Sequence, residues 1–137
     1  ETIGIIAPYR KQVDLIQKSL HYNIEDNWKL IEVNTVDQFQ GRDKDIIIYS
    51  CTKSCSSQSS SKEVDGEILN DKRRLTVALT RSKCKLIMIG DKETLRNYKP
   101  FQELLSSLDE ENIVDLSNED SHFDWNSIFD RTDYCFK

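Results

Sequence analysis

The sequence is poor in the residues that build metal centres. It has four cysteines and two histidines among its 137 residues. Cys51 and Cys55 have a spacing that a metal could use, but no second Cys/His pair follows at a zinc-like distance. Cys51 ends one apolar run and Cys84 precedes another, so we expect both to be small buried residues with free thiols. No metal site is predicted.

The sequence also lacks a phosphate-binding loop. Its glycines are Gly4, Gly41, Gly66 and Gly90, which are scattered, and no Gly-Lys-Ser/Thr triplet occurs. A P-loop needs clustered glycines and a lysine to cradle the nucleotide phosphates. This argues against a kinase-like nucleotide-binding fold, and any phosphate chemistry would be shared with residues outside the chain.

Long apolar runs and an excess of basic charge are absent too. No run approaches the roughly 20 apolar residues of a membrane-spanning helix, so we expect no membrane partner. The formal net charge is −5, with much of the acid after Asp109. Bulk charge therefore does not favour nucleic-acid binding, but it permits a strand held in a cleft beside a second, basic domain. Because Glu1 leads directly into an apolar run, we expect a piece of a longer polypeptide.

Short apolar runs alternate with amphipathic segments along the chain. The runs predict strands at 3–7, 30–33, 45–51 and 85–89, and a last edge strand at 113–116. Helical spacing and capping residues predict helices from about Tyr9, over 72–80, from Asp91 and from Pro100. This alternation is typical of an α/β fold with a largely parallel sheet, in which the run at 45–51 is a central strand.

We assign residues 1–116 to one domain and residues 117–137 to an acidic, aromatic C-terminal extension. The extension could dock onto the domain or contact another domain. Residues 52–65 are rich in serine and cannot bury enough apolar area to offset their ordering entropy. They predict a mobile surface loop, or alternatively a phosphorylated or nucleic-acid-touching loop.

Two polar stretches contain residues suited to nucleotide chemistry. Arg81 is placed at the end of a predicted helix, just before a strand, where its planar fork could donate to a phosphoryl group or form a surface ion pair. Gly41 would let the backbone approach a ligand closely. Asp43 could accept hydrogen bonds from ribose hydroxyls or make an Asx turn.

Other residues suit contact with a nucleic-acid strand. Tyr9 could stack on a base or pack under the first turn of the predicted helix. Arg10 could meet a phosphate at the start of that helix, where backbone N–H groups already favour anions. The hydroxyl and the N–H of Thr35 suit a backbone phosphate, a contact that positions a strand without reading its sequence.

Three segments together resemble motifs IV, V and VI of superfamily 1 helicases of the branch that moves 5′ to 3′. They are Pro8 to Gln12, Thr35 to Asp43 and Arg74 to Arg81. The resemblance implies a RecA-like three-layer α/β domain, the second of two motor domains. It implies that Arg81 is the γ-phosphate arginine, and that Gln40, Gly41 and Asp43 contact the nucleotide. It also implies that Thr35, Pro8, Tyr9 and Arg10 contact nucleic acid. The sequence departs from the family at Asp43, usually Glu, at Thr76, usually Asn, and at Ser82, usually Ala.

Within that superfamily, three features look most like the eukaryotic DNA replication ATP-dependent helicase/nucleases. They are the run Gln40 to Lys44, the lead-in Gly66 to Leu69, and Arg73-Arg74 followed by residues 83–87. This likeness implies ATP with Mg²⁺, bound jointly with a first RecA-like domain, and an iron–sulfur cluster and a nuclease centre only in the upstream polypeptide.

The likeness also implies single-stranded DNA, as 5′ flaps of Okazaki fragments and resected ends, as the partner. Single-strand-binding and other replication or repair proteins could join it, in the nucleus and also in the mitochondrion. One alternative is an RNA or RNA/DNA helicase of the nonsense-mediated-decay or senataxin type. Another is a binding module whose helicase motifs no longer turn over ATP.

Overall fold

The computed structural model describes residues 2–24, 26–39, 42–51, 53 and 68–116. Its strands are β1 (Ile3–Ala7), β2 (Ile31–Thr35), β3 (Lys44–Cys51) and β4 (Ser82–Gly90), and its α-helices are α1 (Arg10–Asn23), α2 (Lys72–Leu79), α3 (Lys92–Leu95) and α4 (Lys99–Ser107). Short 3₁₀ helices are η1 (Asp26–Leu30), η2 (Val36–Phe39), η3 (Ile68–Asn70) and η4 (Glu110–Asn112). The predicted serine-rich loop lies almost wholly outside the described residues, and the C-terminal extension does so entirely.

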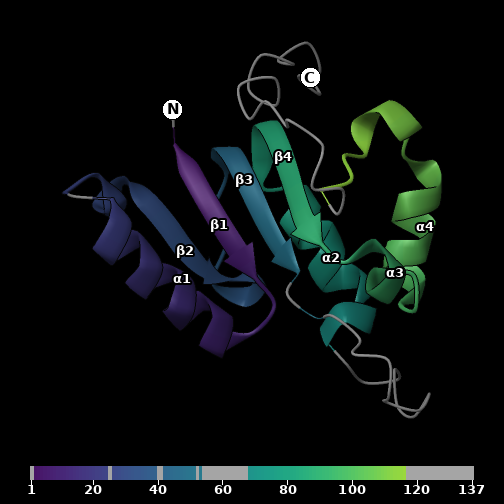
Figure 1. Cartoon of the computed structure of the whole chain (residues 1–137), viewed down its shortest axis with the longest axis horizontal. Coiled ribbons are helices and arrows are strands. Elements are labelled where there is room, and N and C mark those ends of the chain that lie inside the picture. The colour runs from purple at the N-terminus through teal and green to yellow at the C-terminus, as the bar shows by residue number, and fades with distance from the viewer. Residues whose placement is uncertain (1, 25, 40–41, 52, 54–67, 117–137) are drawn as a thin grey trace.

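The strands form a sheet in the order β2-β1-β3-β4, and every neighbouring pair is parallel (Figure 1). The apolar runs of β1 and β3 occupy the two interior positions, where both edges of a strand are hydrogen-bonded. The predicted parallel sheet and the central place of β3 are therefore confirmed. β4 begins at Ser82, three residues before the predicted start at Lys85.

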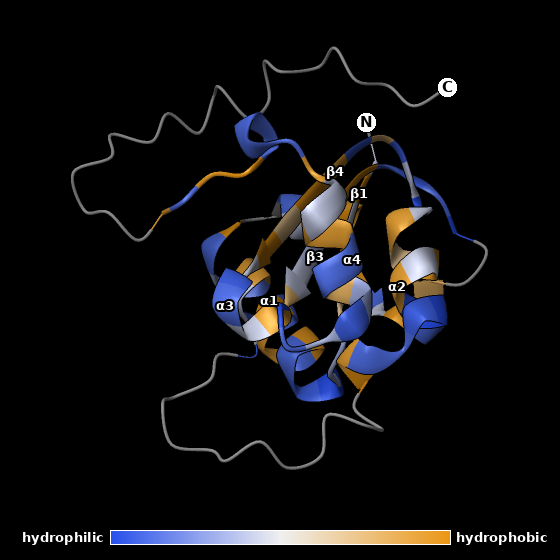
Figure 2. Cartoon of the chain, turned by 90° about the vertical axis from the view of Figure 1, so that its right-hand side faces the viewer, coloured by the Kyte–Doolittle hydropathy of each residue, from blue (hydrophilic) through white to orange (hydrophobic). Residues whose placement is uncertain are grey.

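Helices cover both faces of the sheet. On one face, α1 packs Val13 against Ile5, Ala7 and Val33. On the other face, η2, η3, α2, α3 and α4 enclose the larger core, which is made of Ile6, Val36, Phe39, Ile47, Tyr49, Cys51, Leu69, Leu75, Ala78, Leu95, Tyr98 and Phe101. Figure 2 shows the apolar side of these helices turned toward the strands and the polar side turned outward. The result is the predicted three-layer, RecA-like α/β arrangement.

Local capping determines where the helices begin. The Asp71 carboxylate accepts hydrogen bonds from the backbone N–H groups of Arg73 and Arg74, at 2.9 and 3.2 Å, and starts α2. Asp91 caps α3 in the same way, and Pro100 lies in the first turn of α4. All three of these starts were predicted from the sequence. α2 ends at Leu79, so Arg81 lies two residues beyond it and directly before β4.

Two local predictions are wrong. Residues 113–116 form no strand: the chain leaves η4 without joining the sheet, and Val114 and Leu116 are half exposed. Cys84 is exposed rather than buried, because it lies near the start of β4, which has a neighbour on one side only. Cys51, in contrast, is buried in the larger core as predicted, and burial raises the pKa of its thiol to about 12.

Phe101 should be a main stabilising residue of the layer formed by α4. It is fully buried, and its ring stacks parallel to that of Tyr49 with 6.3 Å between centroids. We expect Phe101→Ala to lower the free energy of unfolding by about 3–5 kcal/mol, from lost burial and the cavity left behind. Urea unfolding of the chain measures this. Leu108→Ala, at a side chain that is 38% exposed, is the control and should cost far less. Similar losses for both variants would contradict this account of the core.

Candidate functional site

The parallel sheet places the predicted site residues at its two opposite edges. Pro8, Tyr9 and Arg10 follow β1, and Thr35 ends β2. These four residues therefore lie where the parallel strands end, which we call the carboxyl edge of the sheet; the opposite side, where the strands begin, is the amino edge. Asp43 precedes β3 and Arg81 precedes β4, so these two lie at the amino edge. β1 has 5 residues, so it separates the two edges by roughly 16 Å, at about 3.3 Å per residue. In the structure, the residues predicted to contact a nucleic-acid strand therefore lie apart from Asp43 and Arg81, which are predicted to contact the nucleotide.

Arg81 is held in one orientation by contacts from α2 and from the segment before β3. Its Nη1 lies 3.0 Å from Asp43 Oδ1, and the side chain is 21% exposed. Its Nε donates to the Val77 carbonyl at 3.3 Å, and its Nη2 donates to Thr80 Oγ1 at 3.4 Å. The planar fork is thus oriented before any ligand arrives.

Asp43 is the acid that pairs with Arg81, and its side chain is 50% exposed. The sequence allowed a surface ion pair for Arg81, and the structure shows one. Asp43, the partner of Arg81, is itself a predicted nucleotide contact. The ion pair thus brings together two predicted nucleotide contacts that are far apart in the sequence. Gln40 and Gly41, the other two predicted nucleotide contacts, lie outside the described residues.

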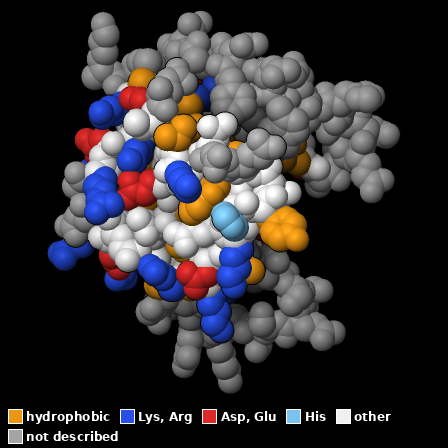
Figure 3. Space-filling model, turned by 90° about the vertical axis from the view of Figure 1, so that its left-hand side faces the viewer, with side chains coloured by type: hydrophobic (Ala, Val, Ile, Leu, Met, Phe, Trp, Pro, Cys, Tyr) orange, Lys and Arg blue, Asp and Glu red, His pale blue; other side chains and the backbone are white. Residues whose placement is uncertain are grey.

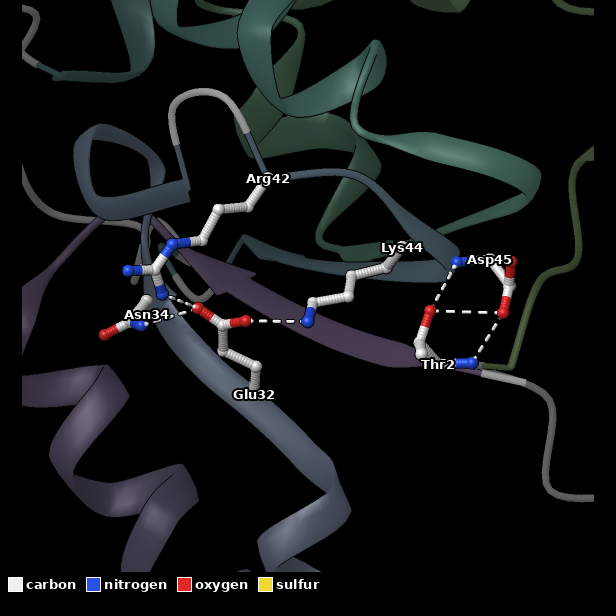
Figure 4. A network of polar contacts seen from close by, with 6 residues as sticks. All are labelled: Thr2, Glu32, Asn34, Arg42, Lys44 and Asp45. Atoms are coloured by element: carbon white, nitrogen blue, oxygen red, sulfur yellow. Dashed lines mark hydrogen bonds and ion pairs between the residues drawn. The ribbon is translucent and has the colours of Figure 1, made fainter.

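A second ionic group is centred on Glu32 of β2 (Figure 4), and its two cations, Arg42 and Lys44, flank Asp43 in the sequence. Its carboxylate accepts hydrogen bonds from Arg42 Nη1 at 2.5 Å and Asn34 Nδ2 at 3.2 Å, and it forms an ion pair with Lys44 Nζ at 2.8 Å. Burial alone would raise the pKa of Glu32. The hydrogen bonds from Lys44 and Arg42, with the charge of Lys44, outweigh burial and hold that pKa below its usual value.

Arg74 links the segment after β2 to the first turn of α2. Its guanidinium forms a bidentate pair with the Asp37 carboxylate, at 3.1 and 3.2 Å, and Nη1 lies 3.2 Å from Asp71 Oδ2. The hydrogen bonds from Arg74 to Asp37, together with the charge of Asp37, raise the pKa of the guanidinium. An open groove of about 210 Å³ lies here, lined by Val36, Asp37, Asp71, Arg73, Arg74 and Val77.

At the carboxyl edge, the structure brings two predicted motifs into contact. Arg10 Nη1 donates to Gln38 Oε1 at 2.8 Å, which joins the start of α1 to η2. Arg10 is exposed, Tyr9 and Thr35 are half-buried, and Pro8 is buried. The Tyr9 carbonyl accepts from the N–H groups of Gln12 and Val13, so Tyr9 is the residue from which α1 starts.

The surface on the α1 side of the molecule carries basic and acidic side chains intermixed, with single apolar side chains between them (Figure 3). The described residues of this face therefore form no extended basic field of the kind that binds nucleic acid by charge alone. Among the described residues, no group of three or more His, Cys, Asp or Glu side chains could hold a metal. No described helix has both the length and the apolar character that a membrane span requires.

Two acids of the site were missed from the sequence. Glu32 is the one charged residue in the run 30–33, whose other residues are Leu30, Ile31 and Val33, and this marks it in the sequence. Asp37 lies in the same polar stretch as Thr35, but nothing in the sequence shows that its partner is Arg74. Both pairs cross between elements, so spacing along the chain could not have revealed them.

The chain matches the model of a protein family described as AAA domain over residues 1–93. It is 44% identical over 112 residues to the DNA replication ATP-dependent helicase/nuclease DNA2 of Homo sapiens, covering 82% of this chain and 10% of that protein. The Schizosaccharomyces pombe protein of the same name is 43% identical over 129 residues, covering 92% of this chain and 8% of that protein. The Saccharomyces cerevisiae protein is 39% identical over 114 residues, with 83% and 7% covered. The chain thus spans about a tenth or less of the length of these relatives.

The lowered pKa of Glu32 predicts a defined pH dependence of stability. A carboxylate with a lowered pKa contributes stability above its unfolded pKa of about 4.3, and this contribution is lost as the pH falls through the folded value. We expect Glu32→Gln to be less stable than wild type at pH 7, and the difference to shrink as the pH falls from about 5 toward 2. Urea midpoints of both proteins across this range measure it. A difference that stays constant with pH would contradict the ionic role of Glu32.

Proposed function

The chain belongs to the AAA domain family, and from this membership and the geometry of its site we propose that it is the second motor domain of an ATP-dependent DNA helicase/nuclease. The observation that carries the proposal is the oriented Arg81 fork beside Asp43 at the amino edge. The larger protein would act on 5′ flaps during Okazaki-fragment processing and on DNA ends during resection. These activities belong to the complete polypeptide, of which this chain is one part.

The donors at the amino edge fit part of a nucleotide. A guanidinium suits phosphoryl oxygens, and a half-exposed carboxylate suits a ribose hydroxyl. The chain has no phosphate loop, so the first RecA-like domain would hold most of the ATP. Mg²⁺, held by that domain, would neutralise charge on the phosphates.

In this arrangement Arg81 acts across the cleft between the two motor domains. Charge grows on the equatorial oxygens of the transferred phosphoryl group in the transition state. A fork that is already oriented stabilises this charge without reorganising. Asp43 orients the fork and can also meet the ribose. Gln40 and Gly41 would approach the same nucleotide.

The residues at the carboxyl edge would bind the single-stranded nucleic acid. Thr35 and the start of α1 offer a hydroxyl and backbone N–H groups to phosphates, and Tyr9 offers a ring for stacking. Arg10 adds a cation, and Pro8, which is buried, completes the proposed strand-contacting turn. Thr35 at the carboxyl edge and Asp43 at the amino edge lie at the two ends of one segment between β2 and β3, which supports coupling between the nucleotide state and binding of the nucleic-acid strand.

Other parts of the proposal concern the complete protein. Its first RecA-like domain is the necessary partner, and single-strand-binding and other replication or repair proteins are further partners. A nuclease centre and an iron–sulfur cluster would lie upstream of this chain. The nucleus, and also the mitochondrion, are the proposed compartments.

Arg81→Ala in the complete protein should abolish ATP turnover while leaving ATP affinity within about tenfold. Most ground-state contacts come from the other domain, whereas loss of the transition-state donor costs roughly 10³–10⁵ in rate. Arg81→Lys should be nearly as damaging, because a flexible ammonium does not reproduce the fork. Measurements of kcat and nucleotide affinity test this.

Arg96→Ala is the matched control for the Arg81 substitution. Arg96 also forms an ion pair, at 2.8 Å with Glu93, but it directly follows α3 and is none of the proposed site residues. It should leave kcat unchanged, and thermal melts should show all variants folded. If Arg81→Ala keeps more than about a tenth of wild-type kcat, Arg81 is only an ion-pair residue and its proposed role in phosphoryl transfer is wrong.

Single-stranded DNA should stimulate the ATPase of the complete protein more than RNA of equal length. The proposed contacts go mainly to the sugar–phosphate backbone, so they discriminate poorly between the two by themselves. The prediction therefore rests on the similarity to the DNA helicase/nucleases. Stimulation that favours RNA would move the assignment to the nonsense-mediated-decay or senataxin type.

A further inference from the structure

Glu32 reaches across a whole strand to its partners. In the sheet, β1 lies between β2 and β3, with Gly4 opposite Glu32 on one side and opposite Ile47 on the other. The Glu32 carboxylate nevertheless contacts Lys44, the first residue of β3, and Arg42 just before it. Figure 4 shows the three side chains converging over β1. We call this group of Glu32, Arg42 and Lys44 the cross-strand clamp.

Gly4 leaves the path that the clamp uses. A Cβ atom at Gly4 would lie 3.0 Å from Lys44 Cγ, 2.8 Å from Ile47 Cδ1 and 2.9 Å from Phe39 Cε1. These distances are too short for carbon atoms in contact, so any side chain at Gly4 would displace its neighbours. Because Gly4 has no side chain, Lys44 can extend across β1 at this position to Glu32.

The clamp controls the direction of the residue between its two cations. Successive side chains point to opposite sides of an extended segment. Arg42 and Lys44 turn toward Glu32, and Asp43 turns the other way, to Arg81 Nη1 at 3.0 Å. The Lys44 N–H also donates to the Arg81 carbonyl at 2.9 Å, so the two segments are in contact through backbone and side chain.

The environment makes this charge group stronger than an ordinary surface pair. The side chains of Glu32 and Lys44 are only 22% and 21% exposed. A partly buried carboxylate with three donors is stabilised more than an exposed one, and removing it leaves two cations facing each other. Without Glu32, the segment 42–44 would therefore shift to separate Arg42 from Lys44.

We propose that Glu32 is a positioning residue for Arg81: through the cross-strand clamp it directs Asp43 onto the guanidinium and so orients the fork for phosphoryl transfer. This inference rests on the proposed function. Glu32 touches neither nucleotide nor strand, and it acts only through Asp43. Its place on β2 makes the outermost strand of the sheet part of the nucleotide site on the other side of β1.

A double-mutant cycle on the complete protein tests the proposal. Glu32→Gln, which keeps the shape and removes the charge, should lower kcat/KM for ATP by about tenfold, since small displacements of a catalytic group have effects of that order or larger. Asp43→Ala should lower it at least as much. The double variant should be no worse than Asp43→Ala alone, because the Asp43 carboxylate is the group through which the clamp is proposed to act on the Arg81 guanidinium. Glu103→Gln is the matched control: it removes a 2.8 Å ion pair with Lys72 at the surface of α4 and should change nothing.

Two results would overturn the proposal: an unchanged kcat/KM in Glu32→Gln, or losses from Glu32→Gln and Asp43→Ala that multiply in the double variant. If Glu32→Gln melts far below wild type, Arg42→Ala takes its place in the cycle. It removes only the clamp's more exposed cation and should also be non-additive with Asp43→Ala. If Arg81→Ala is inactive but the losses from Glu32→Gln and Asp43→Ala multiply, the positioning role of the clamp is overturned and the proposed function stands. If Arg81→Ala is active, the proposed function itself is overturned.

Discussion

The crossover from β2 to β3 is the constraint on which the rest of the structure depends. Both strands point the same way and β1 lies between them, so the chain must return along the sheet before β3 begins. Of the described residues of this crossover, Phe39 in η2 lies against Gly4 of β1. Parallel strands are usually joined by a dozen or more residues including a full helix. Among its described residues, this connection contains the short η2 alone, and Val36 and Phe39 of η2 pack into the core against the sheet. That closeness explains why Phe39 is fully buried and why β1 carries Gly4 beneath it.

The same crossover is attached to α2 near both ends of that helix. Arg74, in the first turn of α2, pairs with Asp37 at the start of the crossover. Arg81, just beyond the last turn, pairs with Asp43 at its end. A shift of the crossover along the sheet would therefore move α2 with it or break an ion pair. Because the crossover runs from the carboxyl edge to the amino edge, this attachment gives a physical route between strand binding and nucleotide chemistry.

The charged side chains of this protein act through ion pairs and hydrogen bonds with near neighbours. The net charge is −5, and the face over α1 mixes basic and acidic side chains. The residues proposed to act on ligands are instead oriented by close polar partners: Arg81 by Asp43 and the Val77 carbonyl, and Arg10 by Gln38. Such preorganised groups suit a site completed by a second domain, because they need little reorganisation when that domain docks.

The sequence alone determined those features that depend on neighbouring residues. The apolar runs located the four strands, Asp71 and Asp91 located helix starts, and the motif pattern pointed to Arg81 and Asp43. Only the tertiary structure decided which strands are neighbours and which edge each site residue occupies. It showed that Cys84 lies exposed on an edge strand, that residues 113–116 form no strand, and that Glu32 reaches Lys44 across Gly4. These outcomes depend on strand order and register, which are set by packing between segments far apart in the chain, whereas hydrophobic period and capping report only on the nearest turns.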